Sequence, residues 1–140
     1  MPMKPEVEYA SAAEAEAAFY SAFTRCDLEA MQLLWARDAA VCVHPGAGPI
    51  RGYEAVLRSW EGILGGAQPP NVRVNIVQRL GDADLAVHMV EEHVSSPGVP
   101  GQEAVVFATN VFRREGRGWL MVAHHASLIA ARQSRAGTLQ

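Results

Sequence analysis

The stretch NVRVNIVQRL, residues 71–80, marks the point at which the sequence changes from helical to strand-like periodicity. Valine and isoleucine alternate there with arginine and asparagine, which is the pattern of a strand with one buried and one exposed face. Three further strands are predicted after it, at 85–94, 102–114 and 119–130, separated by turns rich in glycine, aspartate and proline. The second half of the chain therefore predicts a four-stranded antiparallel meander.

The first half of the chain carries helical signals instead. Ser11 and Glu14 form an S-x-x-E capping box ahead of an alanine-rich run, which predicts a helix over 12–25. Apolar residues recur at helical spacing twice more, and short apolar stretches flank a turn rich in glycine and proline. Two further helices are accordingly expected at 28–36 and 53–64, and two short strands at 41–43 and 50–52. Helices followed by strands indicate an α+β fold.

The composition narrows the class of protein. The chain has 140 residues, of which 49% are hydrophobic, and its net charge is −3. One domain is expected over 1–140, with a core at about 10–130 and flexible ends. No basic stripe favours nucleic-acid binding, and no apolar run is long enough to cross a membrane. Since the start of the chain also lacks the apolar run of a signal peptide, we expect a cytoplasmic protein.

Both faces of the last two predicted strands are apolar, although a sheet covered on one side should alternate apolar and polar residues. The three predicted helices can cover one face of the sheet. Too little chain remains to cover the other face. We therefore expect a homodimer in which a second copy packs against the sheet.

These features together resemble the SnoaL-like and ketosteroid-isomerase-like branch of the nuclear transport factor 2-like superfamily. The resemblance rests on FYSAFTRCDLEAMQLLWARDAAVCVHPG (19–46), IRGYEAVLRSWEGIL (50–64), ATNVFRREGRGW (108–119) and MVAHHAS (121–127). The chain is also similar to the association domain of calcium/calmodulin-dependent protein kinases. The resemblance implies a cone-shaped, cystatin-like fold in which a curved antiparallel sheet wraps the N-terminal helices. It implies dimerisation through the sheet and no obligatory metal or cofactor.

Two adjacent histidines, His124 and His125, stand inside the apolar run at 119–130. Neighbours on a strand point to opposite faces. If the preceding loop has two or four residues, Asn110 shares the face of Met121 and His125, and this row suits a pocket wall. A three-residue loop would exchange the partners. We predict His125 as general base or oxyanion donor and Asn110 as the group that orients either His125 or the ligand; the alternative is a buried histidine bonded to backbone or to Asn110.

Other side chains complete the predicted pocket. Pairing Leu80 with Leu85 across the GDAD turn places Glu91 on the more apolar strand face, where burial would raise the pKa of its carboxyl group. A rim carboxylate is the alternative. His44 precedes a rigid Pro-Gly turn and is the second polar candidate; the alternative is that it serves only the turn. Ligand-binding walls are expected from Tyr20, Trp35, Trp60 and Met121, and the alternative for the aromatic residues is that they fill the core of the cone. No HxH or HExxH spacing occurs, so no metal site is predicted.

The resemblance and the candidate residues support two hypotheses of function. The first is a SnoaL-like pocket protein that binds a small apolar or carbonyl-bearing molecule. If it is an enzyme, the expected chemistry is cofactor-independent proton transfer next to a carbonyl, as in an isomerase, dehydratase or cyclase. The alternative is a non-catalytic, dimeric ligand-binding or assembly domain. Because the superfamily's fold hosts both, the fold alone does not decide between them.

Overall fold

All three helices lie in the first half of the chain and the four long strands in the second half, as predicted. The computed structural model describes residues 8–66, 68–98 and 101–133, and the predicted flexible ends beyond 8 and 133 lie outside these residues. The elements are α1 (Ala12–Thr24), α2 (Leu28–Leu34), β1 (Val41–Val43), β2 (Pro49–Arg51), α3 (Tyr53–Leu64), β3 (Asn71–Gly81), β4 (Leu85–Ser95), β5 (Gln102–Glu115) and β6 (Gly118–Gln133). No helix within the described ranges is long and apolar enough to cross a membrane.

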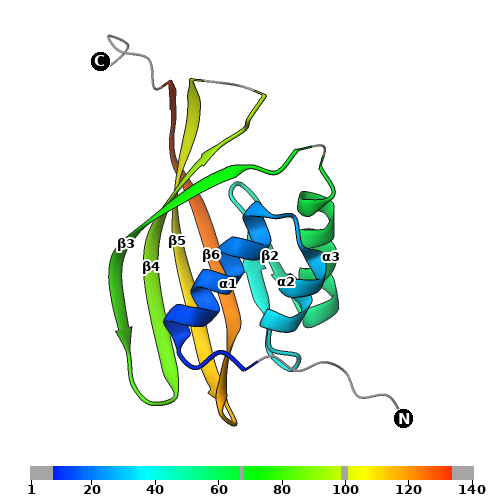
Figure 1. The fold of residues 1–140 in the computed structure, drawn as a ribbon, viewed down its shortest axis with the longest axis vertical. Coiled ribbons are helices and arrows are strands. Elements are labelled where there is room, and N and C mark those ends of the chain that lie inside the picture. Colours follow the sequence, from blue (N-terminus) through cyan, green and yellow to red (C-terminus); the bar gives the residue numbers. More distant parts are fainter. Residues whose placement is uncertain (1–7, 67, 99–100, 134–140) are drawn as a thin grey trace.

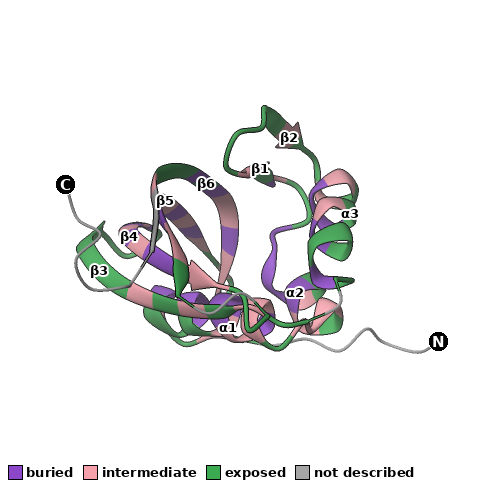
Figure 2. Cartoon of the chain, turned by 90° about the horizontal axis from the view of Figure 1, so that it is seen from above, coloured by how far each residue is buried: buried purple, intermediate pink, exposed green. Residues whose placement is uncertain are grey.

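The strands form one sheet in the order β2-β1-β6-β5-β4-β3 (Figure 1). Neighbouring strands are antiparallel except β1 and β6, which pair in parallel and set Cys42 beside His124. Seen from above, β3 to β6 form one wall, α2, α3 and the β1–β2 hairpin form another, and α1 runs across the base (Figure 2). The curved, unclosed sheet and its helices confirm the predicted α+β cone.

Side-chain caps fix where the first two helices begin. The backbone N–H of Glu14 donates to Ser11 Oγ at 3.1 Å, and the N–H of Ala30 donates to Asp27 Oδ1 at 3.1 Å. Each bond satisfies a donor that has no partner within its helix. Between the helices, Cys26 adopts a left-handed conformation with φ +53°, which turns the chain from α1 into α2.

A β-bulge in β6 decides which of its side chains face the helices. The β5–β6 loop has two residues, one of the predicted lengths, and Phe112 pairs with Met121. The preceding residue of β5, Val111, pairs with Ala123, so Val122 is an extra residue on β6. The bulge shifts the alternation of the strand by one position beyond Val122.

The predicted face of His125 is wrong for this reason. Asn110 pairs with His124, which is buried, whereas His125 is exposed on the outer face of the sheet. The prediction assumed a regular strand through 119–130, in which Met121 and His125 would share a face. With the bulge, Met121 and His124 share the inner face instead.

The predicted register of β3 and β4 is also wrong. Leu80 pairs with Val87 instead of Leu85, and a second irregularity lies between Ile76 and Gln78. Glu91 shares the outer face with Met89, and its side chain is 40% exposed. The alternate residues of β4 point to the inner face, and among them Glu92 is only 3% exposed.

Phe19 lies at the centre of the core between α1 and the sheet. It is fully buried, and its ring meets those of Tyr20, Trp60 and Trp35 edge to face, with centroids 4.8, 5.3 and 6.4 Å away. Edge-to-face packing places the positive rim of one ring on the negative face of another. Phe19 therefore holds α1 against the elements that surround the functional site.

We expect Phe19→Ala to lower the free energy of unfolding by about 3–5 kcal/mol, because it leaves a cavity that rigid aromatic neighbours cannot close. Chemical denaturation followed by tryptophan fluorescence measures the change. Leu85→Ala is the control, since Leu85 is 46% exposed, and it should change the free energy by less than about 0.5 kcal/mol. A loss for Phe19→Ala as small as the control's would contradict a central role for this ring.

Candidate functional site

A pocket of about 350 Å³ opens between the helices and one end of the sheet. Most of its wall is apolar, with contributions from Phe23, Trp60, Ile63, Val94, Val106 and Leu128. Three polar side chains also reach it, namely His44, Glu92 and His124. An apolar cleft of this size with a few converging polar groups is typical of a small-molecule site. No lysine or arginine is among the described residues that line it.

Glu92 is a carboxyl group held inside this apolar surface. Its Oε2 accepts a hydrogen bond of 2.6 Å from the Tyr20 hydroxyl. Burial raises the pKa of Glu92 to about 7, the charge of Glu16 adds to this rise, and the Tyr20 bond opposes it. At neutral pH both the acid and the carboxylate of Glu92 are therefore populated. A general acid or base works best when its pKa lies near the working pH.

His124 lies next to this carboxyl group. Its Nε2 is 3.9 Å from Glu92 Oε2, and its Nδ1 is 2.6 Å from Asn110 Oδ1. Burial lowers the pKa of His124 to about 3, with a smaller contribution from the neighbouring His44. The ring is therefore a neutral imidazole at neutral pH, with one nitrogen protonated and the other free to accept.

Asn110 connects the pocket to a buried polar network beneath it. Its Nδ2 donates to Glu16 Oε2 at 3.0 Å and to the Tyr20 hydroxyl oxygen at 3.1 Å. Burial, and then the charge of Glu92, raise the pKa of Tyr20, so its hydroxyl keeps its proton. Glu16 in turn accepts from Arg79 at 3.2 Å. The polar groups thus form one continuous network from β3 to the pocket.

His44 closes the opposite side of the pocket. Ser59 Oγ donates to the Val56 carbonyl at 2.6 Å, so its only proton is used, and it accepts at 2.9 Å from His44 Nε2–H. The His44 ring lies edge to face on Trp60, and burial lowers the pKa of His44. Burial also raises the pKa of the neighbouring Cys42 thiol to about 12, so Cys42 is a neutral thiol and not a nucleophile.

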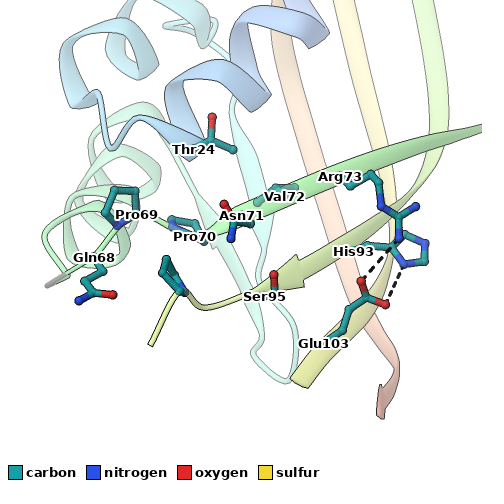
Figure 3. Close-up of a pocket in the computed structure, with 11 residues that line it drawn as sticks. Thr24, Gln68, Pro69, Pro70, Asn71, Val72, Arg73, His93, Ser95 and Glu103 are labelled. Atoms are coloured by element: carbon teal, nitrogen blue, oxygen red, sulfur yellow. Dashed lines mark hydrogen bonds and ion pairs between the residues drawn. The ribbon is translucent and has the colours of Figure 1, made fainter. Parts of the chain in front are cut away.

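A second, larger hollow of about 670 Å³ lies beside the end of α1 and the start of β3 (Figure 3). Its charged groups pair with one another: Glu103 lies 3.5 Å from Arg73 and 3.3 Å from His93 Nδ1 (Figure 3). The first pocket holds buried groups with shifted pKa values instead. Such groups cluster at functional sites, so the first pocket is the candidate site.

The structure brings together only part of the predicted site. His44 and Trp60 line the pocket, and Tyr20 and Asn110 belong to its polar network. Trp35 and Met121 are buried in the core next to each other and do not line the pocket. Glu91 and His125 point to the outer face. The functional roles assigned to these residues stay predictions.

Sequence reasoning missed Glu16, Glu92 and His124, although the first two carried a usable signal. Glu16 and Tyr20 are four apart on a helical face that is otherwise apolar, which is unusual for a glutamate. His88 and Glu92 share one strand face with small and apolar residues. Two buried carboxylates aimed at one sheet face indicate a polar core. His124 had no such signal, because the bulge at Val122 sets its direction.

Comparison with known proteins agrees with the fold. A structure assigned as a calcium/calmodulin-dependent protein kinase type II association domain from Thiobacillus denitrificans is 36% identical, with a TM-score of 0.83 over 91% of this chain and 100% of that one. One assigned as a dehydratase of the NTF2-like family from Streptomyces avermitilis is 33% identical, with a TM-score of 0.77 over 84% and 93%. A ketosteroid isomerase-like protein from Erwinia carotovora, 18% identical with a TM-score of 0.69 over 84% and 93%, shares the fold.

A curated relative matches over a shorter region. The F-box protein SKIP8 of Arabidopsis thaliana is 29% identical over 103 residues, which are 73% of this chain and 42% of that protein. The chain thus spans less than half the length of this relative. The model of the SnoaL-like domain family matches residues 13–131. Because this match covers all three helices and nearly the whole sheet, the chain belongs to the SnoaL-like domain family.

Proposed function

We propose that this protein binds a small uncharged molecule and moves a proton next to its carbonyl group, as an isomerase, dehydratase or cyclase does. The observation that carries the proposal is Glu92, a carboxyl group with a pKa of about 7 inside an apolar pocket. A carboxylate that is destabilised by burial is a stronger base than one in water. The similarity to a structure assigned as a dehydratase supports the same class of reaction.

The neighbours of Glu92 suit a base that returns the proton it takes. The Glu92 carboxylate removes a proton from the carbon next to the carbonyl, and the electrons of the C–H bond pass to the carbonyl oxygen as an enolate. His124, with its pKa of about 3, does not compete for this proton. The proton therefore resides on Glu92, which can deliver it to another carbon of the same substrate, as isomerisation requires, or exchange it with solvent first.

The wall of the pocket indicates the kind of ligand. Aromatic rings of Phe23 and Trp60 provide flat apolar contacts. The lining polar groups are Glu92 and two imidazoles whose pKa values are lowered by burial. With no lysine or arginine among the described lining residues, an anionic ligand would meet a carboxylate without a compensating cation. An uncharged apolar ketone or aldehyde fits these contacts.

The proposal is tested with 2-tetralone, an uncharged bicyclic ketone, by NMR of deuterium uptake at its α-carbon in D2O. We expect the wild-type protein to accelerate exchange over buffer and Glu92→Gln to lose about 10²–10⁴-fold of the rate, since the amide cannot accept the proton. Glu91→Gln is the matched control, because Glu91 is the adjacent residue on the outer face. A wild-type rate equal to that of buffer would overturn the catalytic proposal.

The exchange rate should also depend on pH in a defined direction. The carboxylate of Glu92 is the active form, so the rate should rise as pH increases through about 7 and level off above it. Of the other groups that face Glu92, Tyr20 stays protonated because its pKa is raised, and the pKa values of His124 and His44 are lowered, so both are neutral there. A profile that falls with pH would contradict Glu92 as the base.

A second function, a dimeric assembly domain, is favoured by the outer face of the sheet and by the 36% identity to a structure assigned as an association domain. Across five strands this face carries a continuous row of paired apolar side chains, formed by Leu80, Val87, Val111, Ala123 and Val41. Rows of this kind mark interaction surfaces. We propose that a second copy of the chain covers the row.

Multi-angle light scattering tests the dimer. Wild-type protein should run as a dimer, and Val111→Lys should run as a monomer, because it buries a lysine at the centre of the row. Ala17→Lys introduces the same charge on an exposed position of α1 and should remain a dimer. If wild type is monomeric, or if both lysine variants behave alike, the sheet does not form the interface.

A further inference from the structure

Glu16 is a buried carboxylate that is not among the residues lining the pocket. We propose that Glu16 fixes the tautomer of the neutral His124 ring through the side-chain amide of Asn110. In this arrangement Nδ1 of His124 carries the proton, and Nε2 is left as a bare acceptor beside Glu92. Glu16 is thereby a positioning residue for the pocket. The inference gains its functional meaning from the proposed function, but its evidence and its test are independent of any reaction.

Both carboxylate oxygens of Glu16 accept hydrogen bonds. Its Oε1 accepts from the Arg79 guanidinium at 3.2 Å, and its Oε2 accepts from Asn110 Nδ2 at 3.0 Å. His88 Nδ1 lies 3.1 Å from Oε1 but without the geometry of a hydrogen bond. Since a carboxylate with a guanidinium partner only accepts, it requires Asn110 to present its NH2 group and not its oxygen.

The Asn110 amide has a second partner in Tyr20. Asn110 Nδ2 also donates to the Tyr20 hydroxyl oxygen at 3.1 Å, and the proton of that hydroxyl is committed to Glu92 at 2.6 Å. A flipped amide would place the Asn110 oxygen against two acceptors, the Glu16 carboxylate and the Tyr20 oxygen. Asn110 is completely buried, so water could not relieve this contact. The orientation of the amide is therefore decided by Glu16 and Tyr20.

The orientation of the Asn110 amide determines which ring nitrogen of His124 carries the proton. With its NH2 group committed, Asn110 presents Oδ1 to His124 Nδ1 at 2.6 Å. A contact this short requires an N–H on His124 Nδ1, because two acceptors would repel each other. A neutral imidazole has one N–H, so Nε2 is bare. This bare nitrogen lies 3.9 Å from Glu92 Oε2, so it turns its lone pair and not a proton toward that carboxyl group.

Without Glu16, only the Tyr20 oxygen opposes a flipped Asn110 amide, so the opposite arrangement becomes more populated. A flipped Asn110 could donate its NH2 group to His124 Nδ1, and the imidazole proton would move to Nε2, the nitrogen on the side of Glu92. Nε2–H would then stabilise the Glu92 carboxylate. The two arrangements differ in which atom faces the base, and a residue on α1 selects between them from beneath the pocket.

The test is ¹⁵N NMR of the full chain labelled with ¹⁵N-histidine, which distinguishes protonated from bare ring nitrogens. In wild type at neutral pH we expect His124 with Nδ1 protonated and Nε2 bare. Glu16→Leu removes the acceptor, and the preference for Nδ1 should fall about tenfold or more, the factor expected for losing one buried hydrogen bond. Glu16→Gln removes the charge but keeps an oxygen that accepts from Asn110, so it should keep the wild-type tautomer.

Three results would overturn the inference. The first is a wild-type His124 with its proton on Nε2, a measurement that needs no variant and stands even if Glu16→Leu does not fold. The second is a folded Glu16→Leu protein in which the ratio of the two His124 tautomers is the same as in wild type. The third is a Glu16→Gln protein that shifts as far as Glu16→Leu, which would assign the effect to charge. Because no ligand is involved, failure of the 2-tetralone assay leaves this result standing, and the reverse also holds.

Discussion

The hydrogen bonds of the buried Asn110 amide join the framework of the protein to its pocket. They connect Glu16 and Tyr20 of α1 with His124 of β6 in a region that water does not reach. Polar groups in such a place are stable only when each has its partner, so the network fixes the position of α1 over the sheet as well as the direction of each donor. Structure and proposed chemistry thus depend on the same few atoms.

The pocket carboxyl group obtains its properties from this network and from burial together. Glu92 is surrounded by apolar walls, which disfavour its charge, and by Tyr20, which stabilises it. The balance leaves its pKa near neutrality, where a proton can be both taken and returned. Its sequence neighbour Glu91 shows the contrast, because it lies on the outer face of the sheet and 40% of its side chain is exposed. One position along a strand separates a buried acid from a surface one.

Much of the fold could be predicted from the sequence, because periodicity and capping are local. The capping box at Ser11, the helical spacing at 53–64 and the alternation at 71–80 place elements close to their observed bounds. Which residues face the pocket could not be predicted, because a single inserted residue, Val122, reverses the alternation of β6 and carries no signal of its own. The apolar outer face caused a second error. The more apolar set of alternating β4 residues was taken to face the pocket, and this led to the prediction of Glu91.

Glu92 must titrate near neutral pH to act as the acid and base of the pocket, and its titration tests this role most directly. The side-chain carboxyl carbon of Glu92, followed by ¹³C NMR from acid to alkaline pH and assigned with Glu92→Gln, reports the protonation of this group alone. We expect a midpoint at a pKa of about 7, displaced upward from the ordinary value of 4.5 by burial. A midpoint near 4.5 would show that Glu92 is an ordinary carboxylate and would contradict its role as the base of the pocket.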